Sequence, residues 1–176
     1  PRPWTEGLVT EAISILKGRS GLKILDVGTG SGAIIVSLAS ALGNKNEYFA
    51  SDVSSKALAV AKKNAKRHNV KITFSKSDLL KSWKQEFDVV AANLPYLAKE
   101  TDPSTKHEPK LALISPHKGL KHYQNLIEQL SSWKKHPELL FLECEPQQAQ
   151  PLKILAKKLL PHTQVHITTD SSAAIK

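Results

Sequence analysis

The sequence has 176 residues, of which 40% are apolar, and its 25 Lys and Arg residues outnumber 16 Asp and Glu residues to give a formal charge of +9. A chain of this length can bury one sizeable core, so we expect residues 1–176 to form a single domain. The positive charge suits an acidic or nucleic-acid partner, but it equally serves solubility, so charge alone does not select a function.

The low number of Cys residues and the lack of long apolar runs exclude further classes of protein. Cys144 is the single cysteine, which excludes an internal disulfide and a cysteine-rich metal site, so we predict a reducing, cytoplasmic environment and no bound metal. No apolar run approaches the roughly 18 to 20 residues of a membrane span, and no signal peptide is recognisable. We therefore expect a soluble monomer without a membrane partner. Because the sequence starts at Pro1 and contains no Met, we expect it to be a segment of a longer protein.

Short apolar runs of strand-forming residues alternate with amphipathic segments along the chain, which indicates βαβ units around a parallel sheet. The expected strands are 23–27, 48–52, 71–75, 87–92, 139–143 and 164–168. The expected helices are 31–42, 55–68, 120–133 and 147–159. This alternation predicts an α/β fold with a Rossmann-like, doubly wound and mostly parallel sheet. One long irregular stretch, 93–118, remains, and loops of this length in compact domains are usually functional or disordered.

The segment 55–68 separates apolar from basic residues at helical spacing. The residues expected on its buried face are Ala57, Leu58, Val60, Ala61 and Ala65. The basic residues Lys62, Lys63, Lys66 and Arg67 fall on the other face. We interpret them as a solvated face, with a nucleic-acid interface as the less favoured alternative.

A glycine-rich turn, DVGTGSG at 26–32, lies at the first junction between a strand and a helix. Gly28, Gly30 and Gly32 allow a tight turn and a close approach of the backbone to a ligand, and the following helix offers free N–H groups and the positive end of its dipole. A dinucleotide-binding fingerprint would look similar, so the turn alone does not identify the ligand.

Three acidic residues follow three successive predicted strands, and together they describe a ligand. Asp26 would face a cationic ammonium group, Asp52 would accept hydrogen bonds from ribose hydroxyls, and Asp78 in the segment Ser77–Leu79 would receive the exocyclic amine of adenine. A turn role for Asp52 and a helix-cap role for Asp78 are the structural alternatives. Because the carboxyl ends of parallel strands share one edge, we expect all three acids at one crevice. An amino-acid head, a ribose and an adenine make up S-adenosylmethionine.

The fourth predicted strand ends in Asn93-Leu94-Pro95-Tyr96. Asn and Pro commonly terminate strands, so this tetrapeptide could be a turn and nothing more. The alternative is a site that grips a planar, nitrogen-bearing group, in which an amide supplies the polar contact and an aromatic ring the flat surface.

Several motifs resemble the release-factor glutamine N5-methyltransferases (HemK/PrmC type), a family within the seven-stranded S-adenosylmethionine-dependent methyltransferases, and the resemblance covers nearly the whole chain. Six segments carry it: PRPWTE at 1–6, ILDVGTGSGAIIVSLA at 24–39, ASDVSSKALAVAKKNAKRHNV at 50–70, FDVVAANLPYLAK at 87–99, HEPKLALIS at 107–115, and LEC at 142–144 with Gln148, which resembles the family's fifth strand. The pairing of PRPWTE with HEPKLALIS is the most specific part. Two positions depart from the family pattern: Trp4 replaces an acid, and Leu94 replaces the first proline of the NPPY motif.

The resemblance implies roles for individual residues. In this family the Asn oxygen and the next backbone carbonyl accept the two N–H groups of the target amide, here Asn93 and Leu94, while Pro95 fixes the backbone and Tyr96 packs on the substrate. The implied cofactor-binding residues are Asp26, Gly28, Thr29, Gly30, Gly32, Asp52, Val53, Ser77, Asp78, Leu79 and Asn93. The implied substrate-binding residues are Arg2, Pro3, Thr5, Glu108 and Pro109.

The resulting hypothesis is methyl transfer from S-adenosylmethionine to a glutamine side-chain nitrogen in the Gly-Gly-Gln loop of a peptide-chain release factor. An adenine N6-methyltransferase acting on RNA or DNA is the alternative enzyme, and it would suit the charge of +9. A catalytically silent cofactor-binding or interaction domain is the non-enzymatic alternative. We also expect the family's N-terminal helical bundle to be absent, and the tail to stop before the last strand is complete.

Overall fold

The computed structural model describes residues 3–95 and 119–169. Its strands are β1 (Lys23–Val27), β2 (Glu47–Asp52), β3 (Thr73–Lys76), β4 (Val89–Ala92), β5 (Leu139–Cys144) and β6 (Gln164–Thr169). Its helices are α1 (Pro3–Leu16), α2 (Ala33–Leu42), α3 (Ser55–Arg67), α4 (Lys121–Ser131) and α5 (Pro146–Leu159), with a short 3₁₀ turn η1 (Gly43–Lys45). All six predicted strands and all four predicted helices form, within a few residues of the expected bounds.

The strands make one sheet in the order β3-β2-β1-β4-β5-β6, and every neighbouring pair is parallel. The doubly wound α/β fold is therefore confirmed for the six strands of the described ranges. The expected incomplete last strand would fall in residues 170–176, which lie outside those ranges.

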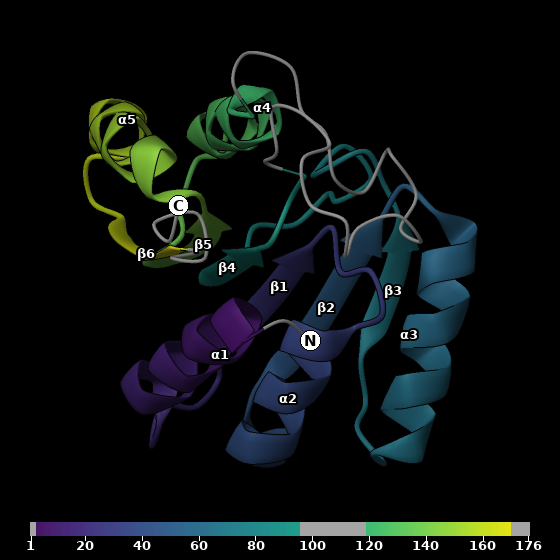
Figure 1. The fold of residues 1–176 in the computed structure, drawn as a ribbon. Coiled ribbons are helices and arrows are strands. Elements are labelled where there is room, and N and C mark those ends of the chain that lie inside the picture. Colours follow the sequence, from purple (N-terminus) through teal and green to yellow (C-terminus); the bar gives the residue numbers. More distant parts are fainter. Residues whose placement is uncertain (1–2, 96–118, 170–176) are drawn as a thin grey trace.

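Helices cover both faces of the sheet (Figure 1). Alternate residues of the strands point to opposite faces, so Leu25, Val90 and Leu140 join one apolar cluster with α4 and α5. Ile24 and Val89 join a second cluster with α1, α2 and Ala65 of α3. The sheet is thus buried on both sides, as the continuous apolar runs of its strands predict.

Helix α1 was not among the predicted elements, although its spacing carries the signal. Leu8, Ala12 and Leu16 recur every four residues and are all buried, and Glu6 lies in the first turn, where an acid favours a helix. The helix packs against α2, β5 and β6, and Thr5 in its first turn is buried.

Helix α3 follows the predicted pattern with one exception. Leu58, Ala61 and Ala65 are buried, and Ser54 caps the helix by accepting a hydrogen bond from the Ala57 N–H at 3.2 Å. The prediction that Val60 is buried is wrong, since 49% of its surface is exposed. Val60 follows Leu58 by two positions, which turns it about 200° away from that residue. The basic residues Lys62, Lys63, Lys66 and Arg67 of this helix are exposed, as expected of a solvated face.

Candidate active site

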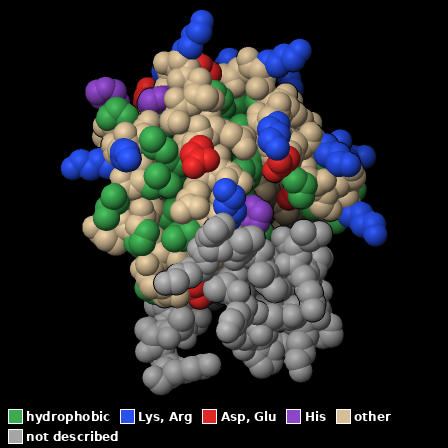
Figure 2. All heavy atoms as spheres, turned by 90° about the horizontal axis from the view of Figure 1, so that it is seen from above, with side chains coloured by type: hydrophobic (Ala, Val, Ile, Leu, Met, Phe, Trp, Pro, Cys, Tyr) green, Lys and Arg blue, Asp and Glu red, His purple; other side chains and the backbone are tan. Residues whose placement is uncertain are grey.

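The carboxyl ends of β1, β2 and β4 form the edge at which the predicted site residues gather. β1 lies between β2 and β4, and all three strands run in the same direction. The order of the strands therefore changes direction next to β1, and in open α/β sheets ligands bind in the crevice outside such a switch point. Figure 2 looks onto this edge from above. Lys and Arg side chains lie at separate places on the uncovered face and around its outline, with Asp, Glu and apolar side chains between them.

The glycine turn after β1 meets the turn after β4. Gly28 has a φ of 71°, a left-handed conformation that favours glycine. A Cβ added to Gly28 would lie 2.7 Å from Leu94 Cδ2 and 3.9 Å from the Asn93 carbonyl oxygen. The absence of a side chain at Gly28 therefore lets the two turns touch, which brings the predicted cofactor segment and the predicted catalytic segment together.

Asp26, in β1 beneath this turn, is completely buried. Thr29 Oγ1 donates a hydrogen bond to its Oδ2 at 2.6 Å, whereas its Oδ1 is buried and has no hydrogen-bond partner within the described ranges. Burial raises the pKa of Asp26 to about 7 against the opposing effects of the Thr29 hydrogen bond and of the nearby Ile35 backbone N–H, and the charge of Asp52 raises it further. An unsatisfied, buried carboxylate oxygen is the kind of group that an approaching cation would stabilise.

Asp52 ends β2 and holds the backbone of the neighbouring turns. Its Oδ2 accepts from the Gly30 N–H at 2.9 Å, and its Oδ1 accepts from the Ser54 N–H at 2.8 Å. Each carboxylate oxygen has two lone pairs, so these bonds leave acceptor capacity for a ligand. Val53, the next residue, is 60% exposed.

The segment after β3 is tied to β2 mainly through its buried residues. The Ser77 N–H donates to the Asp52 carbonyl at 3.0 Å, and the Leu79 carbonyl accepts from Ser51 Oγ at 3.4 Å. Asp78 lies between them, but its side chain is 60% exposed and pairs with Lys81 at 2.5 Å. No helix follows Asp78, so the helix-cap alternative for this residue is wrong.

Asn93, directly after β4, belongs to a chain of polar side chains from three distant parts of the sequence. Asn93 Nδ2 donates to Thr5 Oγ1 at 3.2 Å, and Thr5 Oγ1 donates to Glu143 Oε2 at 2.8 Å. Thr5 and Glu143 are both buried. Thr5, which the resemblance implied to bind substrate, therefore contacts the predicted catalytic amide instead of standing apart from it.

Tyr123, in α4, supports the backbone of the same turn. Its hydroxyl oxygen accepts from the Leu94 N–H at 3.0 Å and its hydroxyl group donates to the carbonyl of Glu143 in β5, with the Leu94 carbonyl a more distant acceptor at 3.4 Å. Tyr123 is fully buried, and Leu94 is nearly so. The fully buried hydroxyl thus joins the turn that follows β4 to the end of β5. No sequence motif had marked Tyr123, and Glu143 belonged only to the fifth-strand segment of the family resemblance, without a predicted role in the site.

Several predicted residues are not placed by the structure. Arg2, Tyr96, Glu108 and Pro109 lie outside the described residues. Pro3 is the first residue of α1, and Pro95 is half-buried beside Leu94. The roles implied for these residues stay predictions.

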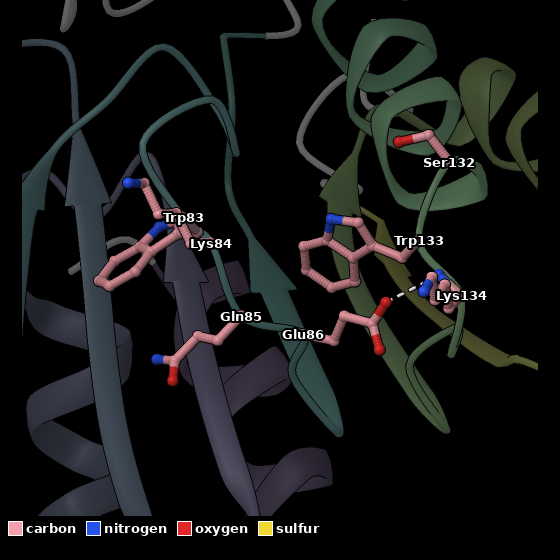
Figure 3. A pocket seen from close by; sticks show the side chains of 7 residues that line it. All are labelled: Trp83, Lys84, Gln85, Glu86, Ser132, Trp133 and Lys134. Atoms are coloured by element: carbon pink, nitrogen blue, oxygen red, sulfur yellow. Dashed lines mark hydrogen bonds between the residues drawn. The ribbon is translucent and has the colours of Figure 1, made fainter.

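A separate depression of about 450 Å³ lies at the opposite, amino edge of the sheet. Figure 3 shows Trp83 and Trp133 on its walls, with Glu86 Oε1 accepting from the Lys134 N–H at 2.7 Å. Both tryptophans also pack on Phe87, with ring centroids 5.3 and 5.9 Å apart, so they belong to the apolar core as much as to the depression. This region contains none of the predicted site residues.

Other chemistries find little support in the part of the chain that the structure describes. It contains no group of three or more His, Cys, Asp or Glu side chains arranged to hold a metal ion. Burial raises the pKa of the Cys144 thiol to about 12, so this thiol is not an activated nucleophile. None of the helices in ranges 3–95 and 119–169 has the length and apolar character needed to cross a membrane.

A family model described as a methyltransferase domain matches residues 18–159. The chain belongs to this family. The matched range runs from the end of α1 through α5 and includes the glycine turn, all three predicted acids and Asn93.

Curated relatives are similar to this chain over almost its whole length. The chain is 35% identical over 182 residues to a protein of Bacillus cereus and 38% identical over 175 residues to one of Lactococcus lactis subsp. lactis, both named release factor glutamine methyltransferase. Each match covers 97% of this chain and 64% of the relative. The chain therefore spans just under two thirds of the length of these relatives.

Solved structures agree on the fold. A ribosomal protein L11 methylase from Lactobacillus delbrueckii subsp. bulgaricus matches 90% of this chain and 69% of its own with a TM-score of 0.67 at 21% identity. TrmN from Thermus thermophilus matches 89% of this chain and 40% of its own with a TM-score of 0.60 at 24% identity. These similarities support the methyltransferase architecture, and they bear on nothing beyond the fold.

Proposed function

We propose that this chain transfers a methyl group from S-adenosylmethionine to the side-chain amide nitrogen of a glutamine, in the Gly-Gly-Gln loop of a peptide-chain release factor. The observation that carries the proposal is the placement of Asn93, whose amide is held at the carboxyl edge of β4 where the turn meets the glycine turn of β1. The names of the relatives support the choice of substrate.

The residues at the glycine turn fit S-adenosylmethionine. The buried, unpartnered Oδ1 of Asp26 suits its ammonium group, the free lone pairs of Asp52 suit its ribose hydroxyls, and exposed Val53 offers an apolar surface to its adenine. Asp78 would reach the adenine amine by exchanging its contact with Lys81. When bound, the cofactor supplies an electrophilic methyl group on a positively charged sulfur.

The residues after β4 fit an amide acceptor. An amide nitrogen is a weak nucleophile because its lone pair is delocalised, so the protein contributes mainly by holding it in line with the methyl group. Asn93 Oδ1 and the Leu94 carbonyl would accept its two N–H bonds and stabilise the positive charge that develops on nitrogen. The Tyr123 hydroxyl accepts from the Leu94 N–H at 3.0 Å and lies 3.4 Å from the Leu94 carbonyl oxygen, so it fixes the backbone on both sides of this residue. The second lone pair of the Leu94 carbonyl would serve the substrate. One proton of the methylated nitrogen then leaves to solvent.

The experiment that tests this function offers labelled S-adenosylmethionine to the full chain together with three substrates in parallel. These are a release factor, the same factor with the Gln of its Gly-Gly-Gln loop replaced, and ribosomal RNA. The proposal predicts label on the intact factor alone. Label on RNA, or on the Gln-substituted factor, would contradict it and favour the adenine N6-methyltransferase or another target.

A further inference from the structure

Three polar side chains that are far apart in sequence form one line of hydrogen bonds into the core. Asn93 follows β4, Thr5 lies in the first turn of α1, and Glu143 belongs to β5. The two bonds measure 3.2 Å from Asn93 Nδ2 to Thr5 Oγ1 and 2.8 Å from Thr5 Oγ1 to Glu143 Oε2. Glu143 is completely inaccessible to solvent and Thr5 is 6% exposed. Burying a polar side chain costs free energy unless hydrogen bonds replace those that it made to water. Each of these three side chains has such a bond, and apolar residues would have avoided the cost altogether.

The chemistry of the three groups gives the line a direction. The Thr5 hydroxyl donates to Glu143 Oε2 at 2.8 Å, and a hydroxyl has a single proton to donate. The Thr5 oxygen can then act only as an acceptor toward Asn93, and it must face the NH2 group of that amide. If the amide turned over, Asn93 Oδ1 would face the lone pairs of Thr5 and the hydrogen bond would be lost. Glu143 therefore fixes the orientation of the Asn93 amide through Thr5: Nδ2 faces Thr5 and Oδ1 faces away from it.

The line is also anchored on rigid parts of the fold. α1 packs on both β5 and β6, so Thr5 is carried by a helix docked on the sheet. Tyr123 ties the Leu94 N–H to the backbone carbonyl of Glu143, so the strand that carries the carboxylate also supports the turn that carries the amide. Side chains that are fixed in this way keep a catalytic group in its productive orientation.

We propose that Thr5 and Glu143 are positioning residues, which act through Asn93 by keeping its Nδ2 toward α1 and its Oδ1 toward the acceptor amide. This inference rests on the proposed function for the meaning of that orientation, but the orientation itself is a property of the protein alone. Thr5 would not touch the substrate. Its hydroxyl, rather than its size, is what the site needs.

The kinetic test uses isosteric variants of Thr5 at saturating methyl donor. Thr5→Val keeps the shape and removes the hydroxyl, so turnover should fall at least about tenfold, the effect of losing one well-placed hydrogen bond, while donor affinity changes by less than about twofold. Thr5→Ser keeps the hydroxyl and should recover most of the lost turnover. A matched control is Thr163→Val, which removes a hydroxyl bonded at 2.7 Å to the Pro137 carbonyl before β6, away from the site. It should lower stability without lowering turnover.

A double variant separates positioning from a merely structural role. If Thr5 acts through Asn93, adding Thr5→Val to Asn93→Ala should reduce turnover no further than Asn93→Ala does alone. Multiplied losses in the double variant would overturn the proposal. So would equal turnover in Thr5→Val and the original protein.

An observation that needs no activity keeps this proposal separate from the proposed function. The NMR signals of the Asn93 side-chain NH2 group can be assigned by their loss in Asn93→Ala. In the unsubstituted protein these protons should exchange slowly with solvent, and Thr5→Val should speed their exchange at least about tenfold, whereas Thr163→Val should not. If the protein methylates no release factor but the signals behave this way, the proposed function fails and the positioning role stands. Unchanged exchange in Thr5→Val would overturn the positioning role whatever the substrate.

Discussion

At the amino edge of the sheet aromatic side chains pack against one another, whereas at the carboxyl edge buried polar side chains surround a turn of glycines. Phe87 contacts Phe49, Trp83 and Trp133, with ring centroids 5.0 to 5.9 Å apart. Each edge also holds one buried polar atom without a hydrogen-bond partner among the described residues, Trp83 Nε1 at the amino edge and Asp26 Oδ1 at the carboxyl edge, and the carboxylate oxygen is the costlier of the two to bury. Aromatic packing stabilises a fold, but an unsatisfied buried carboxylate destabilises it. The comparison indicates that packing at the amino edge stabilises the fold and offsets the free-energy cost of the buried polar site at the carboxyl edge.

The largest effect should follow from damage to the amino edge. Phe87→Ala removes a ring that is 1% exposed, and large-to-small changes of this kind cost about 3 to 5 kcal/mol in the free energy of unfolding. Denaturant titration measures this loss, and the milder Phe87→Leu serves if the alanine variant does not fold. The protein that remains folded should turn over as before. Lost turnover in fully folded protein would show that the two edges are not separate in role.

A pH effect should appear at the carboxyl edge. The pKa of Asp26 is raised to about 7 in the folded protein, above its value in the unfolded chain, so ionising it destabilises the fold as pH rises from about 4 to 7. A bound cation would favour the ionised form. Affinity for S-adenosylmethionine should therefore increase with pH between about 5 and 7, by at most about tenfold per unit. Calorimetry across this range measures it.

The variant Asp26→Asn is the control for that titration. It keeps the shape and the Thr29 contact but cannot ionise, so its affinity should be lower and nearly independent of pH over the same range. A pH dependence that survives in Asp26→Asn would assign the titration to another group.

A smaller effect is expected from Asp52. Asp52→Ala should weaken S-adenosylmethionine binding by about 1.5 to 3 kcal/mol, the range for hydrogen bonds to a charged group, through lost ribose contacts and a looser glycine turn. Glu138→Ala removes the same charge from an exposed pair with Arg19 at the amino edge and should leave affinity unchanged. Equal affinities in both variants would remove Asp52 from the cofactor site.

The smallest effect should come from a surface ion pair at the amino edge. Partial burial disfavours ionised Asp88, but hydrogen bonds from Lys135 and from the Lys23 backbone outweigh it and lower the pKa of Asp88. Lys135 is largely exposed, so Lys135→Ala should cost at most about 1 kcal/mol at neutral pH. An acid whose pKa is lowered in the folded protein stabilises the fold at pH values above its pKa in the unfolded chain. The difference in stability between the original protein and Lys135→Ala should therefore shrink as pH falls below about 4. Thermal unfolding at pH 7 and pH 3 compares them.

Local sequence signals predicted most of the fold. β1 forms at the expected residues, and the other strands shift by three residues or fewer, because apolar alternation and flanking turns are properties of short segments. Helix α1 was missed although Leu8, Ala12 and Leu16 carry a helical spacing. The prediction that Val60 is buried was wrong because the spacing of apolar residues along a helix does not determine which of them face the sheet.

The candidate site was predictable only where its residues follow strands. Asp26, Asp52 and Asn93 each end or follow a parallel strand, so topology alone brings them to one edge. The contact of Thr5 with Glu143 joins residues 138 positions apart, and no local pattern predicts it. The fit of Leu94 against Gly28 likewise depends on how two distant turns approach each other.

The central claim is that Asn93 holds the acceptor nitrogen while the glycine turn holds the methyl donor, and Asn93→Ala tests it most directly. Turnover on a release factor or a Gly-Gly-Gln peptide at saturating donor should fall by about 10²-fold or more, equivalent to about 2.7 to 4 kcal/mol of transition-state stabilisation. Donor affinity, measured by calorimetry on the same preparation, should stay nearly unchanged. Near-normal turnover in Asn93→Ala would contradict the account and leave Asn93-Leu94-Pro95 as a strand terminator.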